Sequence, residues 1–161
     1  MQIRTITISS HMKHTNQHRL SVMMTEFEDA CRKADLKVTH QRLEIYRELA
    51  RAKDHPSAEM LYKRILKRLP TISLDTVYRT LSTLEKHGLI TRVQTVESQA
   101  RFEAKMACHH HAVCTKCGSI TDFTWDELDT LTMPSSLSDW GKVTKKNATL
   151  EGICSTCGGS E

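Results

Sequence analysis

Apolar residues recur at helical spacing through the first half of the chain. Four stretches place them every three or four positions, which predicts four amphipathic helices: 25–36, 40–52, 58–69 and 74–87. The last is the clearest, because Leu74, Val77, Leu81 and Leu84 form one continuous row. The other expected inward rows are Phe27, Ala30, Cys31 and Ala34; Leu43, Tyr46 and Ala50; and Leu61, Ile65 and Leu69.

Polar and helix-breaking residues mark the ends of these helices. Thr39, Ser57 and Ser73 each precede a helical stretch and carry the side-chain oxygen that an N-cap needs. Pro70 is expected to end the third helix, and Gly88 stands where a residue with positive φ commonly closes the fourth. The N-terminal half is therefore expected to be a set of short, well-capped helices.

Two strand-like pieces follow, over 89–96 and 100–103, and the polar tip 97–99 lies between them. This arrangement is typical of a β-hairpin. Short helices followed by a hairpin predict a winged helix-turn-helix, in which helix 74–87 would enter the major groove of DNA.

The pattern changes near residue 104. Residues 111–115, 119–124 and 142–153 are expected to be strands, and 125–132 a short acidic helix. This part has too few apolar residues for a large core, so we expect a metal ion to hold it together. The predicted fold class is therefore α+β, with a winged helix-turn-helix followed by a small α/β domain.

These patterns divide the chain into three parts. Residues 1–22 are polar and lack the apolar middle and cleavage site of a signal peptide, so we expect a flexible extension. The winged helix is assigned to 23–104 and the metal-containing domain to 105–161. The lack of a signal peptide favours the reducing cytoplasm, where paired cysteines more often hold metal than form disulfides.

Two identical C-x-x-C pairs are the strongest chemical signal in the sequence. They are Cys114, Cys117, Cys154 and Cys157. Four thiolates around Zn²⁺ make a closed, tetrahedral structural site. The alternative is a C-x-x-C thiol oxidoreductase, but such enzymes use one active pair near a βαβ unit. Two matched pairs without that context favour zinc.

Charge adds a DNA-binding hypothesis. The chain carries a net charge of +4, with the basic excess in its N-terminal part, and no apolar run approaches the roughly 20 residues of a membrane span. The polar face of helix 74–87 offers side chains suited to a DNA groove: Thr76, Tyr78, Arg79, Thr80 and Thr83. Arg42 is a candidate for phosphate contacts. The alternative is an ordinary solvated helix face.

Histidines and carboxylates predict a second metal site. In an extended strand, His109 and His111 point to one side and can share an ion, leaving His110 toward solvent. Three further candidates stand at junctions between elements: His55, Glu103 and Asp122. A nitrogen and oxygen site suits Fe(II), Mn(II) or a labile Zn(II). An ion held by both domains would set the angle between them. The alternative is a zinc-stapled interaction module without a regulatory metal.

Six stretches together resemble the ferric uptake regulator family of metal-dependent repressors. They are KVTHQRLEIY (37–46), HPSAEMLY (55–62), TISLDTVYRTLSTLEKHGLI (71–90), RFE (101–103), HHHAVCTKCGSITDF (109–123) and CSTC (154–157). The resemblance implies a homodimer that binds a palindromic operator on double-stranded DNA, with the C-terminal domain as the dimerisation and metal-sensing domain. It implies structural zinc on the four paired cysteines. It implies a regulatory metal on His55, Glu103, His109, His111 and Asp122, and DNA contacts from Tyr78 and Arg79.

The resemblance also bears on the branch of the family. Some iron-sensing members have a third metal site, but its positions hold Cys108, His110 and Lys146 here, which predicts that the site is absent, as in the peroxide-sensing branch. Asp122 also resembles that branch, whereas Glu103 resembles the iron sensors. In the peroxide mechanism, bound Fe(II) reacts with H₂O₂, a ligating histidine is oxidised and DNA is released. We favour a peroxide-responsive repressor, with iron-responsive and zinc-responsive repressors as alternatives.

Overall fold

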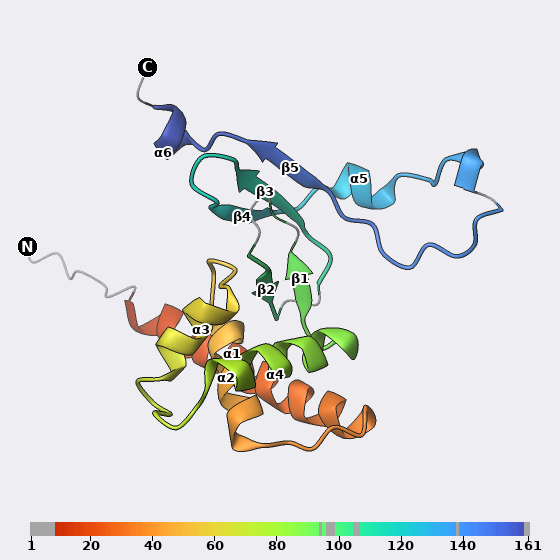
Figure 1. The fold of residues 1–161 in the computed structure, drawn as a ribbon. Helices are drawn as coiled ribbons and strands as arrows, with labels where there is room; N and C mark the ends of the chain where they lie inside the picture. The colour runs from red at the N-terminus through yellow and green to blue at the C-terminus, as the bar shows by residue number, and fades with distance from the viewer. Residues whose placement is uncertain (1–8, 94, 96–98, 105–106, 138, 160–161) are drawn as a thin grey trace, which may run out of the picture.

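The structure is a computed structural model that describes residues 9–93, 95, 99–104, 107–137 and 139–159. Figure 1 shows a helical unit, a two-stranded hairpin beside it and a three-stranded sheet beyond the hairpin. The helical unit contains α1 (Ser9–Lys33), α2 (His40–Arg51), α3 (Ala58–Ile65) and α4 (Leu74–Lys86). The hairpin pairs β1 (Thr91–Val93) with β2 (Arg101–Glu103) in antiparallel register. The predicted α+β fold with a winged helix-turn-helix is confirmed.

The predicted rows contain the buried centre of each helix, but some of their members are only partly buried: Ala30, Ala34, Leu69 and Leu74. The third helix also ends at Ile65, one turn before the expected stop at Pro70. Val77, Leu81 and Leu84 of α4 are all fully buried. On α2, however, Ile45 and Leu49 are buried, whereas the expected Leu43 and Ala50 are only partly buried. The reason is that α2 contacts α1, α3 and α4, so its buried arc is wider than the single stripe that the sequence indicates.

The predicted caps are present. The hydroxyl of Thr39 accepts from the amide of Arg42 (3.2 Å), and Ser57 and Ser73 do the same for the amides three residues on. Gly88 follows the C-cap of α4 with φ of +68°, a conformation that glycine adopts without strain. These local interactions place both ends of α4.

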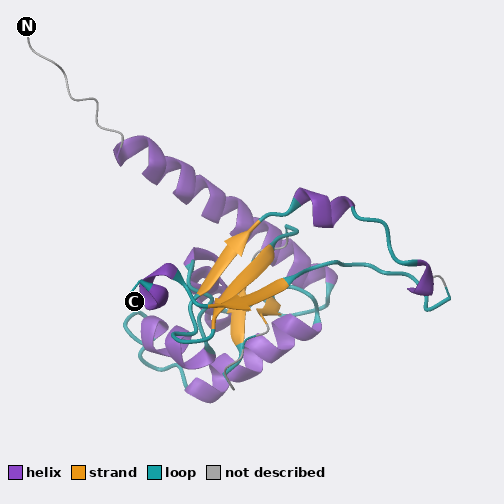
Figure 2. Ribbon diagram, turned by 90° about the horizontal axis from the view of Figure 1, so that it is seen from above, coloured by secondary structure: helices purple, strands orange, loops and turns teal. Residues whose placement is uncertain are grey.

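The N-terminal extension differs from the expectation. α1 begins at Ser9, so the expected flexible segment 1–22 is helical from that residue on, and residues 1–8 lie outside the described part. Leu20 and Met23 pack against the helical core, and the ring of Phe27 stacks on Tyr46 at 3.7 Å. These contacts extend the helix beyond the stripe that starts at residue 25. Figure 2 shows α1 projecting past the rest of the helical unit.

The C-terminal domain is a small sheet. β3 (His110–Cys114) lies in the centre, antiparallel to β4 (Ile120–Phe123) and parallel to β5 (Thr149–Gly152). The predicted strand 142–153 is therefore wrong over most of its length, because only its end pairs with β3. The short helices α5 (Asp126–Thr130), η1 (Ser135–Leu137) and α6 (Ser155–Gly158) complete the domain.

The buried apolar cluster of this region is very small. It contains Val93 of the hairpin with Val113 and Ile120 of the sheet. Trp140, on the long connection before β5, is 71% exposed. Packing alone therefore gives this domain little stability, in line with the expected metal staple. The described residues include no helix that is both long and apolar enough to cross a membrane.

The predicted hairpin tip is only partly visible. Residues 97 and 98 of the tip, together with 94 and 96 of the first strand, lie outside the described residues, as do 105 and 106 at the predicted domain boundary.

Candidate metal centres

Five predicted ligands converge from four separate places in the fold. His55 lies in the turn between α2 and α3, with φ of +47°, directly before Pro56. Glu103 ends β2, His109 precedes β3, and His111 on β3 lies opposite Asp122 on β4. One ligand atom from each residue lies within 4.8 Å of all the others. We call these five residues the bridging cluster, because two come from the winged helix and three from the sheet or the residue directly before it.

A backbone hydrogen bond joins the two winged-helix segments that carry His55 and Glu103. The amide of Phe102, next to Glu103, donates a hydrogen bond to the carbonyl of Pro56, next to His55, over 3.1 Å. The turn that carries His55 and the strand that carries Glu103 are therefore joined directly.

Glu103 is the centre of the bridging cluster. Its Oε2 lies 2.8 Å from His109 Nε2 and 3.3 Å from the Nε2 atoms of both His55 and His111. Burial alone would raise the pKa of Glu103, but the hydrogen bonds from the three rings outweigh it and hold the pKa well below its usual range. The group is therefore an ionised carboxylate, ready to bind a cation.

Asp122 completes the set from the sheet. Its Oδ1 lies 2.8 Å from His55 Nε2 and 3.8 Å from His111 Nε2. Four members of the cluster are buried, and Asp122 is partly buried. His55 Nδ1 and Glu103 Oε1 are buried without a hydrogen-bond partner in the described residues. Buried nitrogen and oxygen atoms that face one another without full pairing fit a divalent ion of intermediate hardness.

A cavity leads from the surface to the bridging cluster. It has a volume of about 700 Å³ and is lined by residues of α1, by the end of α2 and by three cluster members, His55, Glu103 and Asp122. Arg19 and Met23 of α1 form part of its wall. Water and small solutes can therefore approach the ion position from this side. Sequence reasoning missed this wall, because it assigned residues up to 22 to a flexible extension.

The four paired cysteines form a second cluster. Their sulfurs lie within 4.8 Å of one another, and Cys117 Sγ is 3.8 Å from Cys154 Sγ. The amide of Cys154 donates to Cys114 Sγ and lowers the pKa of that thiol to about 6, whereas hydrogen bonding to Cys117 raises the pKa of Cys157 to about 12. Crowded thiolates repel one another, which keeps Cys157 protonated in the absence of a cation. A Zn²⁺ ion supplies the missing charge, so the donor set fits a closed zinc site.

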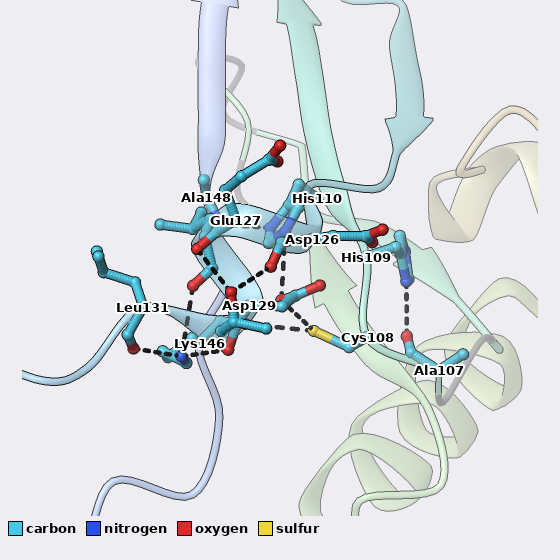
Figure 3. A network of polar contacts seen from close by, with 12 residues as sticks. Ala107, Cys108, His109, His110, Asp126, Glu127, Asp129, Leu131, Lys146 and Ala148 are labelled. Carbon is cyan, nitrogen blue, oxygen red and sulfur yellow. Dashed lines mark hydrogen bonds and ion pairs between the residues drawn. The ribbon is translucent and has the colours of Figure 1, made fainter.

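The side chain of His110 is completely buried, so the prediction that it faces solvent is wrong. Its ring packs near Phe123, with centroids 5.4 Å apart, and its Nδ1 accepts from the amide of Ala148 over 3.0 Å. The segment before β5 and the helix α5 cover this face of β3, which the local pattern could not reveal (Figure 3).

Cys108 and Lys146 lie beside His110. These three residues occupy the positions of the third metal site that the sequence predicts to be absent. Cys108 Sγ donates to Asp129 Oδ1 over 3.1 Å, and this hydrogen bond raises the pKa of the thiol. Lys146 Nζ donates to carbonyls at the end of α5. A lysine cation, a protonated thiol and a buried imidazole thus meet around Asp129 (Figure 3). Asp129 was missed from the sequence, because it was one acid among several in a short acidic helix.

The predicted DNA-contacting residues of α4 lie on its outer side. Tyr78 is exposed and its hydroxyl donates to Glu59, while Arg79 pairs with Asp75 one turn earlier. Thr76, Thr80 and Thr83 are partly buried. Both acidic partners were missed from the sequence, although an Asp four residues before an Arg is a recognisable helical pair.

Arg42 lies on α2 rather than α4. Its guanidinium donates to the carbonyl of Lys37, just before that helix. It therefore supports the start of α2 in this structure, and a phosphate contact would require it to turn outward.

A model of the ferric uptake regulator family matches residues 33–150. The chain belongs to this family. Members are metal-dependent transcriptional repressors that bind DNA as dimers, and they are not enzymes. The alternative of a thiol oxidoreductase is therefore excluded.

Relatives and solved structures agree with this assignment. The chain is 32% identical to the peroxide-responsive repressor PerR of Staphylococcus epidermidis, over 78% of this chain and 84% of that protein. It is similar to the ferric uptake regulator Fur of Helicobacter pylori, whose structure is described as revealing three functional metal binding sites. That match has 27% identity and a TM-score of 0.68, over 86% of this chain and 93% of that one. The Vibrio cholerae ferric uptake regulator matches with 32% identity and a TM-score of 0.65, over 78% and 98%.

Proposed function

We propose that a divalent ion in the bridging cluster sets the position of α4 and thereby switches operator binding by this family member. The observation that carries the proposal is the convergence of five donor side chains from both domains within 4.8 Å. An ion that binds only when the halves are together stabilises that arrangement by its binding free energy. The dimer would then present two α4 helices to a palindromic operator, in the cytoplasm.

We further propose which ions are bound. Zn²⁺ at the four cysteines would be structural, because four sulfur ligands leave no open position. The bridging cluster, with nitrogen and oxygen donors only, suits Fe(II) or Mn(II), and Zn(II) is a further candidate. Cys108 contributes no thiolate to this cluster, since its sulfur donates to Asp129 instead.

We favour peroxide as the signal to which this repressor responds. The first relative named above is a peroxide-responsive repressor, and the 700 Å³ cavity gives a small oxidant access to the bridging cluster. Bound Fe(II) would supply the one-electron chemistry that splits the O–O bond of H₂O₂. His55 and His109 would be held beside the ion, so that one imidazole is oxidised and takes up one oxygen atom of the peroxide, while the other oxygen leaves as water.

The direct test compares operator binding with Fe(II) and with Mn(II), each before and after H₂O₂. Both ions are expected to activate binding, and peroxide is expected to abolish it only with Fe(II), since Mn(II) serves as the redox-inactive control under these conditions. Mass spectrometry should then find one added oxygen atom on His55 or His109. The same binding curves with and without peroxide in Fe(II) would reject the peroxide response.

An iron-responsive repressor is the second candidate. The observation in its favour is Glu103, which lies at the centre of the bridging cluster. Its longer side chain changes how closely a carboxylate approaches the ion compared with Asp. In that case Fe(II) would activate binding reversibly, and H₂O₂ would leave the histidines unmodified.

The DNA-facing role of α4 is tested at Arg79. Replacing it with alanine is expected to weaken operator binding by about 1–3 kcal/mol if it reads a base edge. Fluorescence anisotropy with labelled operator measures the change. Arg32→Ala is the matched control, because Arg32 is also exposed and also pairs with acids on its own helix, α1. An equal loss in both variants would show that only general charge matters.

A further inference from the structure

We propose that Asp129 and His110 are positioning residues of the bridging cluster, acting from the opposite face of β3. The proposal rests on the proposed function of that cluster as a metal site. His110 stands between two of the predicted ligands, His109 and His111, and side chains along a strand alternate between its faces. Whatever fixes His110 therefore also constrains the rotation of the segment 109–111, which carries the two ligands at the start of β3.

The hydrogen bond to Ala148 defines the state of the His110 ring. Because Nδ1 accepts from a backbone N–H over 3.0 Å, the proton of the neutral ring must lie on Nε2. That Nε2 is buried and has no hydrogen-bond partner among the described residues, but Asp129 Oδ1 lies 3.5 Å away. A small approach of the carboxylate completes a hydrogen bond from Nε2–H. Asp129 is therefore placed to accept from Nε2–H and to orient the ring.

Asp129 is itself held in place by two other groups. Its Oδ1 accepts from Cys108 Sγ over 3.1 Å, directly beside the ligand His109. Lys146 donates to the carbonyls of Leu128 (3.3 Å) and Leu131 (2.8 Å), which flank Asp129. The ammonium satisfies carbonyls at the end of α5 and ties that helix to the segment before β5. Figure 3 shows these polar contacts gathered between α5, the segment before β5 and His110 on β3.

This arrangement resembles the outer-shell support of known metal sites, except that it acts through the strand rather than through a ligand ring. Partners of that kind typically change metal affinity by 10–100-fold when removed. Since His110 acts through the backbone of its neighbours, we expect an effect near the lower end of that range.

The experiment measures Mn²⁺ affinity of the zinc-loaded full chain by competition with a fluorescent chelator, in the absence of DNA. Asp129→Ala is expected to weaken Mn²⁺ binding about tenfold, with zinc content and circular dichroism unchanged. Asp129→Asn should restore most of the affinity, because its amide oxygen can still accept from Nε2–H. Glu127→Ala is the control, an exposed acid on the same helix.

A second readout separates positioning from a general loss of packing. In ¹⁵N-labelled protein, the imidazole signals of His110 are expected to report the Nε2–H form in the wild type and in Asp129→Asn. They should change in Asp129→Ala. An unchanged Mn²⁺ affinity in Asp129→Ala, or an equal loss in Glu127→Ala, would overturn the positioning role while leaving the proposed function intact. A wild-type chain that binds no Mn²⁺ or Fe(II) beside its zinc would overturn both.

Discussion

Replacing His109 with alanine is expected to abolish metal-dependent operator binding while the structural zinc stays in place. His109 Nε2 lies 2.8 Å from Glu103 and 3.1 Å from His111 Nε2, so it directly contacts two other members of the bridging cluster. Loss of a direct ligand should exceed the roughly 10–100-fold cost of losing an outer partner. Without the ion, the two halves of the subunit lose the shared ligand that the proposal places between them.

The measurement titrates Mn²⁺ into protein with labelled operator and follows anisotropy. Glu103→Ala should give the same result, whereas His87→Ala, an exposed histidine outside the cluster, should bind operator with the wild-type metal dependence. Elemental analysis should find about one zinc per chain in all three variants. Metal-dependent operator binding that survives both His109→Ala and Glu103→Ala would show that the ion binds elsewhere.

Replacing Cys157 with serine is expected to remove the zinc and unfold the C-terminal domain. Among the described residues, the buried apolar cluster here contains Val93, Val113 and Ile120, which is too small for packing to compensate. Structural zinc sites contribute on the order of 10 kcal/mol to folding. Because this domain is the expected dimerisation domain, the variant should also become monomeric and lose operator binding.

Zinc content, light scattering and far-ultraviolet circular dichroism report the three effects. Cys31→Ala is the matched control, because Cys31 is buried in the helical core and takes no part in the cysteine cluster. It should keep its zinc and its dimeric state. A zinc-free Cys157→Ser protein that remains dimeric and folded would remove the structural role from the site.

Much of the winged helix could be predicted from local sequence. The row through Val77, Leu81 and Leu84 and the caps at Thr39, Ser57 and Ser73 depend only on neighbours a few residues away, so the pattern contains them. The two cysteines of each C-x-x-C pair could also be predicted to share a metal, because they are only three positions apart. The meeting of His55 with Asp122 was different, because these residues were candidates from their places at junctions and from the resemblance, and not from periodicity.

Features that depend on contacts between distant segments could not be predicted from the local spacing of apolar and polar residues. Burial of His110 is created by Ala148 and α5, and the length of β5 is set by where it pairs with β3. The wide buried arc of α2, which includes Ile45 and Leu49, arises because three helices surround it. The sequence did not predict that α1 begins at Ser9, because the part of this helix before residue 25 has no clear apolar stripe.

The hydrogen bond between Phe102 and Pro56 has a consequence for metal selectivity. Because it joins the segments that carry His55 and Glu103, these two ligands move together, and the chain around β3 and β4 carries the other three ligands. The bound ion would then lie between these two groups of ligands, and the distance between the groups would follow the ionic radius. The size of the cation would thus be converted into a displacement of α4, so that ions with similar affinity could still differ in how well they align the protein on its operator.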